Sequence, residues 1–324
     1  MISTLTKRPE QTWLEYLSQL VWKKGNLNAA SYDAFLRAAS LGVPASIAIE
    51  EVAARIRAAG DYPRPRKLED QWRRAAMYVK ANPDTPIVPP VQRPVFDPER
   101  AKRFAERVPA SVDLAWLKRL SPVPTWITPA EYLSAIFRHG DQVLVFSDWR
   151  SQGEALYQNW ALKVDRDALK SFVSGHQAGV WFLSNPVDGQ YHFNPRQDSM
   201  SRRSEESITA WRYAVLECDH KPKETWLPIW LRILVQLPLP IVSITSSGGK
   251  SLHALSRVDA ESKAAWDQFV RGRLLPRLVP LGADGQALTA IRLTRLPGCY
   301  RGDSLQELLF LNPRATLQPI FQKG

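Results

Sequence analysis

The chain has 324 residues, of which 44% are hydrophobic and 10% aromatic, so it is large and apolar enough to form two or three folded domains. Its net charge of +11 favours a polyanionic partner such as nucleic acid, although a basic protein without such a partner can have the same composition. The sequence shows no signal peptide and no run of about 18 apolar residues, so we expect no membrane span. The two cysteines are too few for a disulfide framework or a four-cysteine zinc site, which favours a reducing, cytoplasmic location.

Residues 1–83 predict a helical accessory domain. Apolar residues recur at spacings of three and four, for example at Trp13 and Leu17. Such a domain can bind DNA, a helicase or a catalytic domain, and the sequence leaves these alternatives open. Residues 84–120 predict a proline-rich linker followed by connecting helices.

Residues 121–324 predict an α+β domain that carries the chemistry. Short apolar segments suitable for buried strands alternate here with helical segments. The expected strands lie at 141–146, 179–183, 213–219, 241–245 and 252–258. An apolar, Trp-rich helix is expected between the third and fourth of these strands.

The strand at 213–219 ends in an acidic pair, Glu217 and Asp219. Side chains alternate along a strand, so these two carboxylates share one face while Cys218 points to the other. Two neighbouring carboxylates repel each other unless a cation lies between them, and a hard divalent ion such as Mg²⁺ takes oxygen ligands. The alternative is a solvent-facing acidic pair without a metal, which is common at strand ends.

A phosphate cradle is predicted where the next strand ends, in the segment Ser247-Gly-Gly-Lys250-Ser251-Leu-His253. The two glycines allow a sharp turn that exposes backbone N–H groups, and Lys250 adds positive charge. The segment is not a P-loop, because Ile244 stands where that motif requires glycine and because a strand pattern follows in place of a helix. Ser251 and His253 lie two residues apart and therefore share a strand face.

Arginines gather in two further segments. Arg202, Arg203 and Arg212 precede the acidic strand, where they either contact phosphate or lie in a surface loop paired with neighbouring glutamates. Arg292 and Arg295 precede a Pro-Gly turn, and Arg301 follows it. Guanidinium groups beside a triphosphate would stabilise its charge, but a basic edge strand has the same pattern.

The motifs Glu217-Cys-Asp219, Ser251-Leu-His253 and Arg292-Leu-Thr-Arg295-Leu-Pro-Gly298 together resemble the archaeo-eukaryotic primase superfamily. The chain is similar to the primase-polymerases of bacterial mobile elements over about residues 124–312. The resemblance implies an RRM-like antiparallel or mixed sheet within a two-layer α/β domain. It also implies that the first motif binds the catalytic metals and that the histidine contacts the triphosphate of the incoming nucleotide.

The family has a third metal-binding acid, for which Asp284 is our choice. Asp284 precedes a glycine, and Asp-Gly is a common turn pair, so a role confined to the turn is an equal alternative. Glu217 departs from the aspartate that is usual at its position. Its longer side chain can still reach a metal.

We therefore expect template-directed nucleotidyl transfer by a DNA primase or primase-polymerase. The resemblance implies two Mg²⁺ or Mn²⁺ ions on Glu217, Asp219 and Asp284, with His253 as a fourth catalytic residue. The expected triphosphate-binding residues are Ser247, Lys250, Ser251, His253, Arg292 and Arg295, and those expected to contact a single-stranded DNA template are Arg202, Arg203, Arg212 and Arg301. A separately encoded helicase is a possible partner. Two alternatives remain: a non-catalytic single-stranded-DNA-binding or replication-initiation protein, and a metal-dependent nuclease.

Overall fold

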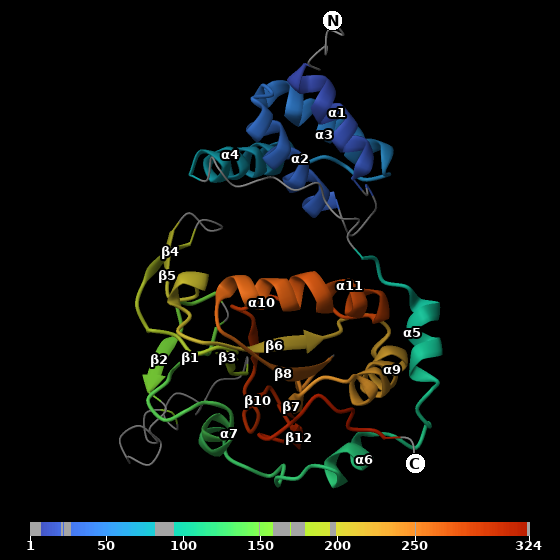
Figure 1. The fold of residues 1–324 in the computed structure, drawn as a ribbon, viewed down its shortest axis with the longest axis vertical. Helices are drawn as coiled ribbons and strands as arrows, with labels where there is room; N and C mark the ends of the chain where they lie inside the picture. The colour runs from blue at the N-terminus through green and yellow to red at the C-terminus, as the bar shows by residue number, and fades with distance from the viewer. Residues whose placement is uncertain are drawn as a thin grey trace, which may run out of the picture. The chain divides into compact units, whose positions relative to one another are not determined.

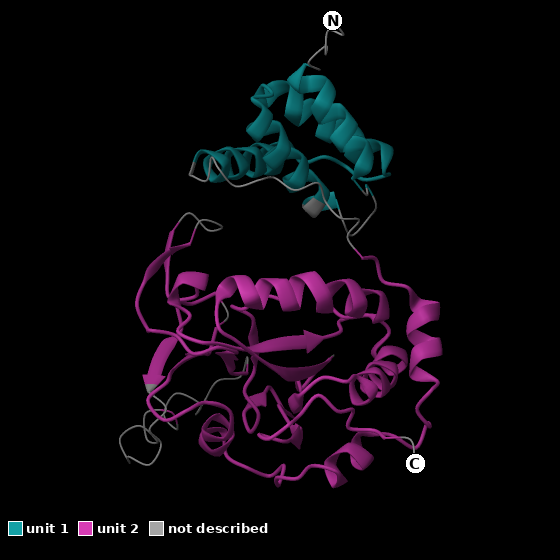
Figure 2. Ribbon diagram, in the orientation of Figure 1, with its two compact units in different colours: residues 1–93 teal, residues 94–324 magenta. Residues whose placement is uncertain are grey.

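The computed structural model describes residues 8–20, 22, 27–81, 94–148, 150–157, 169, 179–194, 199–249 and 251–322. The chain divides into two compact units, Met1–Arg93 and Pro94–Gly324 (Figure 2). Most of the expected proline-rich linker lies outside the described residues. In the described part of the chain, no helix has the length and apolar character needed to cross a membrane.

The first unit is helical, as the periodicity predicts. Its helices are α1 (Pro9–Gln19), α2 (Leu27–Leu41), α3 (Ala45–Ala58) and α4 (Pro65–Ala81) (Figure 1). They enclose their own core, in which Trp13, Phe35 and Val52 are fully buried. The Trp13 indole donates a hydrogen bond of 2.9 Å to the Ala34 carbonyl, which satisfies its only polar atom inside this core.

The second unit begins with α5 (Pro98–Ala105) and α6 (Leu114–Arg119). We expected these helices to connect two domains. They instead belong to the second unit, because Ala101 and Leu117 are fully buried in the same core as Trp230. The boundary between the units therefore falls before α5.

A four-stranded antiparallel sheet forms the centre of the second unit. Its strands are β6 (Trp211–Glu217), β7 (Ile241–Ser246), β8 (Leu252–Ala260) and β12 (Leu308–Leu311), in the order β12-β7-β8-β6. Successive residues of β6 face opposite sides of the sheet, and both sides are apolar. Ala214 and Leu216 join the core beneath α9 (Lys223–Gln236) and α10 (Lys263–Phe269), whereas Tyr213 and Val215 join the core on the other side.

That other side is covered by α7 (Pro129–Ile136) and by residues of a second antiparallel sheet. This sheet contains β1 (Gln142–Phe146), β2 (Glu154–Tyr157), β3 (Trp181–Leu183) and β9 (Leu293–Arg295), in the order β2-β1-β3-β9. The Tyr132 hydroxyl of α7 lies 2.8 Å from the Ser243 hydroxyl of β7 and joins the two structures through a buried hydrogen bond. The predicted α+β class is confirmed, whereas the division of the strands into two sheets was not expected.

The remaining elements are short. They are the hairpin of β4 (His192–Asn194) and β5 (Ser199–Ser201), the 3-10 helix η1 (Glu205–Ser207), the hairpin of β10 (Tyr300–Arg301) and β11 (Ser304–Leu305), and a continuation of α10 through the π-helix η2 (Val270–Leu274), α11 (Leu275–Leu278) and the 3-10 helix η3 (Val279–Leu281). The expected strand positions agree with β1, β3, β6, β7 and β8 to within two residues at each end.

Candidate nucleotide and metal site

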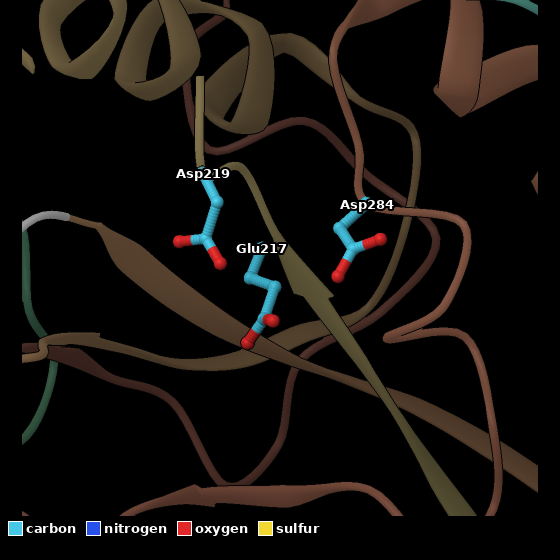
Figure 3. A group of neighbouring side chains, drawn as sticks. All are labelled: Glu217, Asp219 and Asp284. Atoms are coloured by element: carbon cyan, nitrogen blue, oxygen red, sulfur yellow. The ribbon is translucent and has the colours of Figure 1, made fainter. Parts of the chain in front are cut away.

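Three carboxylates meet at the end of β6. Glu217 is the last residue of the strand, Asp219 follows it, and Asp284 comes from the loop after η3. A backbone hydrogen bond of 2.8 Å from the Asp284 N–H to the Glu217 carbonyl fixes this loop against the strand. Each residue offers a carboxylate oxygen, and these oxygens lie within 4.8 Å of one another, with the side chains pointing toward a common centre (Figure 3).

Burial makes this cluster of negative charge costly. The Glu217 side chain is only 2% exposed, and its Oε2 atom accepts no hydrogen bond from any described residue. Burial, followed by the nearby Asp219 carboxylate, raises the pKa of Asp284 above its usual value. The nearest ring nitrogen, Nδ1 of His253, lies 3.5 Å from this oxygen. A buried carboxylate with an oxygen that accepts no hydrogen bond, beside two others, fits a site built for a cation.

The donor set fits a hard divalent ion. All three groups are carboxylates, the ligand type that Mg²⁺ and Mn²⁺ prefer. Asp284 is also a turn residue, because its Oδ1 atom accepts a hydrogen bond of 2.9 Å from the Gln286 N–H. Asp284 therefore has the turn role that an Asp-Gly pair predicts, and its carboxylate also belongs to the cluster, while its role as a metal ligand stays a prediction.

A guanidinium group faces the same carboxylates. Arg292 forms an ion pair with the Oε1 atom of Glu217, and its Nη2 atom lies 3.7 Å from the Oδ2 atom of Asp284. The described structure thus places one positive charge between two of the three acids. Any divalent ion at this position has to share Glu217 with Arg292 or replace it there.

The loop between β7 and β8 adjoins the cluster. The Ser247 hydroxyl accepts a hydrogen bond of 3.2 Å from the Ser251 N–H, and the Ser247 N–H donates to the Ser251 carbonyl at 3.0 Å. Gly248 has a φ of +64°, and a Cβ atom there would lie 3.2 Å from the Ser304 carbonyl oxygen, so glycine is needed for this tight turn. Lys250 lies outside the described residues.

His253 stands directly opposite Glu217 in the pairing of β6 with β8. Its Nε2 atom lies 3.2 Å from the Ser251 hydroxyl, and its Nδ1 atom lies 3.2 Å from the Thr294 hydroxyl. Burial and the positive charge of Arg295 lower the pKa of His253 to about 3. The imidazole is therefore neutral at pH 7 and acts there through hydrogen bonds, not through charge.

Arg295 is held by the second sheet. Its guanidinium lies 3.8 Å from the centre of the Trp181 ring, and it donates a hydrogen bond of 3.3 Å to the Gln306 side-chain oxygen. Burial lowers its pKa to about 10, with a further contribution from Arg301. The group stays protonated at pH 7 and keeps the charge that a polyphosphate would require.

These side chains line one cleft of about 330 Å³ between the ends of the two sheets. Its lining residues are Trp181, Arg203, Glu217, Asp219, Ser247, Ser251, His253, Arg292, Leu293, Arg295 and Arg301. Most of the residues that the sequence singled out as acidic or phosphate-binding are thus gathered in a single cavity. Arg203 enters it with its Nε atom donating to the Ile291 carbonyl at 3.0 Å, and burial lowers its pKa to about 10.

Two of the predicted nucleic-acid contacts lie elsewhere. Arg202 is not among the residues that line the cleft and lies beside the β4–β5 hairpin, where it donates to the Gly153 carbonyl at 3.2 Å. Arg212 is buried and forms a two-pronged ion pair with Asp141, just before β1. The nucleic-acid contact expected of Arg212 is therefore replaced by an internal role that ties the two sheets together.

Two residues of the site, Trp181 and Thr294, were not predicted from the sequence. Thr294 lies two residues after Arg292, and the alternation of side chains along a strand is a signal that could have placed both on one face. Trp181 lies in β3 and reaches Arg295 only through the pairing of β3 with β9, for which no local sequence pattern exists.

Comparisons of the chain with protein-family models, with curated proteins and with solved structures gave no match.

Proposed function

We propose that the second unit is a metal-dependent nucleotidyltransferase that joins nucleotides on a single-stranded DNA template, as primase-polymerases do. One observation carries the proposal. Three carboxylates suited to divalent ions line or adjoin the same cleft as a neutral histidine and several arginines. Metal-binding carboxylates by themselves occur in many hydrolases. Carboxylates that face a cationic surface in the same cleft suit the transfer of a phosphate group from a highly charged triphosphate.

Glu217, Asp219 and Asp284 would hold two Mg²⁺ or Mn²⁺ ions. When bound, these ions would supply Lewis acidity at the attacking hydroxyl and at the phosphate oxygens. Arg295 and Arg301 would bind the β- and γ-phosphates, since guanidinium groups match phosphate oxygens in geometry and charge. The Ser251 hydroxyl would accept a hydrogen bond from the Nε2–H group of His253 and donate its own O–H group to a phosphate oxygen.

In the reaction, the 3′-hydroxyl of the growing strand would give its proton to water, and its oxygen would form a bond to the α-phosphorus as the bond to the pyrophosphate oxygen breaks and pyrophosphate leaves. The chain's own groups would position the triphosphate for this in-line displacement. Neutral His253, with its ring nitrogens beside the Ser251 and Thr294 hydroxyls, would orient the Ser251 hydroxyl toward a phosphate and would add no charge beside the proposed metal-binding acids. Arg292 would neutralise Glu217 before substrate arrives.

A non-catalytic DNA-binding protein is the second candidate. The Glu217–Arg292 ion pair favours it, because an internal cation already compensates the most buried acid of the cluster. In that case DNA would bind to the basic residues while the acids remain without a metal.

A primer-synthesis assay separates these candidates. The full chain would be incubated with single-stranded DNA, labelled ribo- or deoxynucleoside triphosphates and Mg²⁺ or Mn²⁺. Wild type and Glu261→Gln, which alters an exposed acid at the end of β8, should make labelled oligonucleotides, whereas Asp219→Asn and Asp284→Asn should not. DNA binding without synthesis under every condition would refute the enzyme, and shortening of a labelled strand would identify a nuclease.

A further inference from the structure

The β4–β5 hairpin presents three large apolar side chains on one exposed face. Phe193 and Met200 are directly opposed across the hairpin and are 51% and 53% exposed. Tyr191, two residues before Phe193 and therefore on the same side, is 46% exposed. We call these three residues the hairpin face. The hairpin projects from the body of the second unit, at the opposite end of β6 from α9 (Figure 1).

The opposite side of the hairpin is anchored to the protein. His192 lies on that side and its Nε2 atom is 2.7 Å from the Asp188 carboxylate, while its strand partner Ser201 is buried. The contacts of His192 and Ser201 fix one side of the hairpin against the protein. Because side chains alternate along each strand, the apolar residues of the hairpin face then point outward.

Positive charge adjoins the hairpin face and continues into the cleft. The Arg202 guanidinium lies 4.7 Å from the centre of the Tyr191 ring, and no described carboxylate forms an ion pair with it. Its neighbour Arg203 lines the cleft, also without an ion pair to a described carboxylate. The hairpin face is thus followed along the chain by two arginines, of which Arg202 contacts Tyr191 and Arg203 lines the cleft.

We propose that the hairpin face binds single-stranded nucleic acid by stacking its bases, with Arg202 contacting the adjoining phosphate. Aromatic rings beside uncompensated guanidinium groups form the usual surface for unpaired strands, because every base has a flat face and every linkage a charge. A second copy of this chain fits less well, because it would bring one Arg202 and a net charge of +11 toward another. That the bound strand continues into the cleft as template rests on the proposed function, whereas the binding itself does not.

The test is the affinity of the full chain for a fluorescein-labelled oligothymidylate, measured by fluorescence anisotropy in EDTA so that no metal contributes. Phe193→Ala and Tyr191→Ala should each raise the Kd by roughly 5- to 100-fold, the range expected when one base loses its stacking partner. Trp126→Ala is the matched control, because Trp126 is an 86% exposed aromatic residue of the same unit outside the hairpin, and its Kd should stay within about twofold of wild type.

Two further measurements identify the interaction. An oligonucleotide with abasic sites should bind to wild type more weakly than the intact oligothymidylate does. The difference in affinity between these two oligonucleotides should be smaller for Phe193→Ala, because this variant has already lost the stacking on Phe193. Arg202→Gln should make the slope of log K against log salt less negative by about 0.7, the value for one phosphate contact on a single strand, while the aromatic variants keep the wild-type slope. Circular dichroism and thermal unfolding would confirm that each variant is folded.

Unchanged affinity in both aromatic variants would overturn the proposal. The proposal would also be overturned if the aromatic variants kept their affinity for DNA but lost self-association in sedimentation experiments. That result would assign the hairpin face to contact with a second copy of the chain. Primer synthesis measured on the same preparations keeps the two hypotheses apart. If the aromatic substitutions weaken DNA binding but no protein synthesises primers, only the proposed enzyme is refuted. If primers are made and the substitutions leave DNA binding unchanged, only the stacking surface is refuted.

Discussion

Arg292 forms an ion pair with Glu217 inside the cleft, where the Glu217 side chain is 2% exposed and the Arg292 side chain 26%. The same guanidinium lies 3.7 Å from Asp284. One arginine therefore balances two of the three carboxylates that we propose as metal ligands. We therefore expect stability and the proposed metal binding to be linked through this residue, because the acids need a positive charge whether or not a metal is present.

Arg292→Met should destabilise the metal-free protein by about 3 kcal/mol, because it leaves a buried carboxylate without its counter-charge. Urea unfolding in EDTA measures this change. Mn²⁺ should restore more stability to the variant than it adds to wild type, since the metal then meets no competing cation. The control is Arg277→Met, which changes an exposed arginine of α11 and should have little effect. Equal effects of Mn²⁺ on both proteins would contradict this linkage.

Divalent ions should stabilise the wild-type fold in proportion to their binding. At a free concentration of 100 times the Kd, the free energy of unfolding should rise by about 2.7 kcal/mol. Asp219→Asn and Asp284→Asn should lose most of this increase, whereas Glu261→Gln should keep it. Asp284→Asn is a sharp test, because the asparagine carbonyl can still accept the hydrogen bond from Gln286 and keep the turn. Full stabilisation of that variant would confine Asp284 to the turn.

The sequence was informative where local pattern determines position. The apolar run ending in Glu217 predicts a strand with the acids at its end, and the alternation of Ser251 and His253 places them on one face. These short-range relations hold in the structure, with the two side chains 3.2 Å apart. The primase resemblance selected Asp284, and the structure adds the backbone hydrogen bond to Glu217 that brings it to the other acids.

Relations between distant segments could not be predicted in the same way. The stacking of Arg295 on Trp181 depends on the pairing of β3 with β9, and the partner of Arg212 lies 71 residues earlier in the chain. A basic segment rich in serine looks alike whether its arginines face solvent or a buried carboxylate. Strand order and side-chain burial, which the tertiary fold determines, decided between these cases.

Arg212→Met should lower stability by about 3 kcal/mol without changing the affinity for single-stranded DNA. The reason is that its guanidinium pairs with Asp141, and the two side chains are only 10% and 13% exposed. Urea unfolding and anisotropy with oligothymidylate test the two parts. The double variant Arg212→Met with Asp141→Asn should lose less stability than the sum of the losses in the two single variants.

Arg301→Met should give the reverse pattern, with weaker DNA or nucleotide binding at unchanged stability, because Arg301 is exposed at the cleft.

Thr294→Val should weaken nucleoside triphosphate binding by roughly 3- to 10-fold, the effect of one neutral hydrogen bond, because His253 loses the group that orients its Nδ1 atom. Equilibrium binding of a labelled triphosphate measures this change. In the His253→Ala background the same substitution should have no further effect, since there is no imidazole left to orient. Thr289→Val is the control, because it changes a half-buried threonine of the same unit that is not bonded to His253 in the described structure. An equal loss in both backgrounds would show that Thr294 acts on its own.

Residues 94–324 should fold without the first unit and keep the response to Mn²⁺. The cores explain this expectation: the helical unit encloses Trp13 and its neighbours, whereas the buried residues around Trp230 and around Tyr132 all belong to the second unit. The isolated fragment should therefore show one cooperative urea transition and the same increase in stability with Mn²⁺ as the full chain. A fragment that is folded by circular dichroism but no longer responds to Mn²⁺ would show that the metal site depends on the first unit. A fragment that does not fold would show that the helical unit stabilises the second.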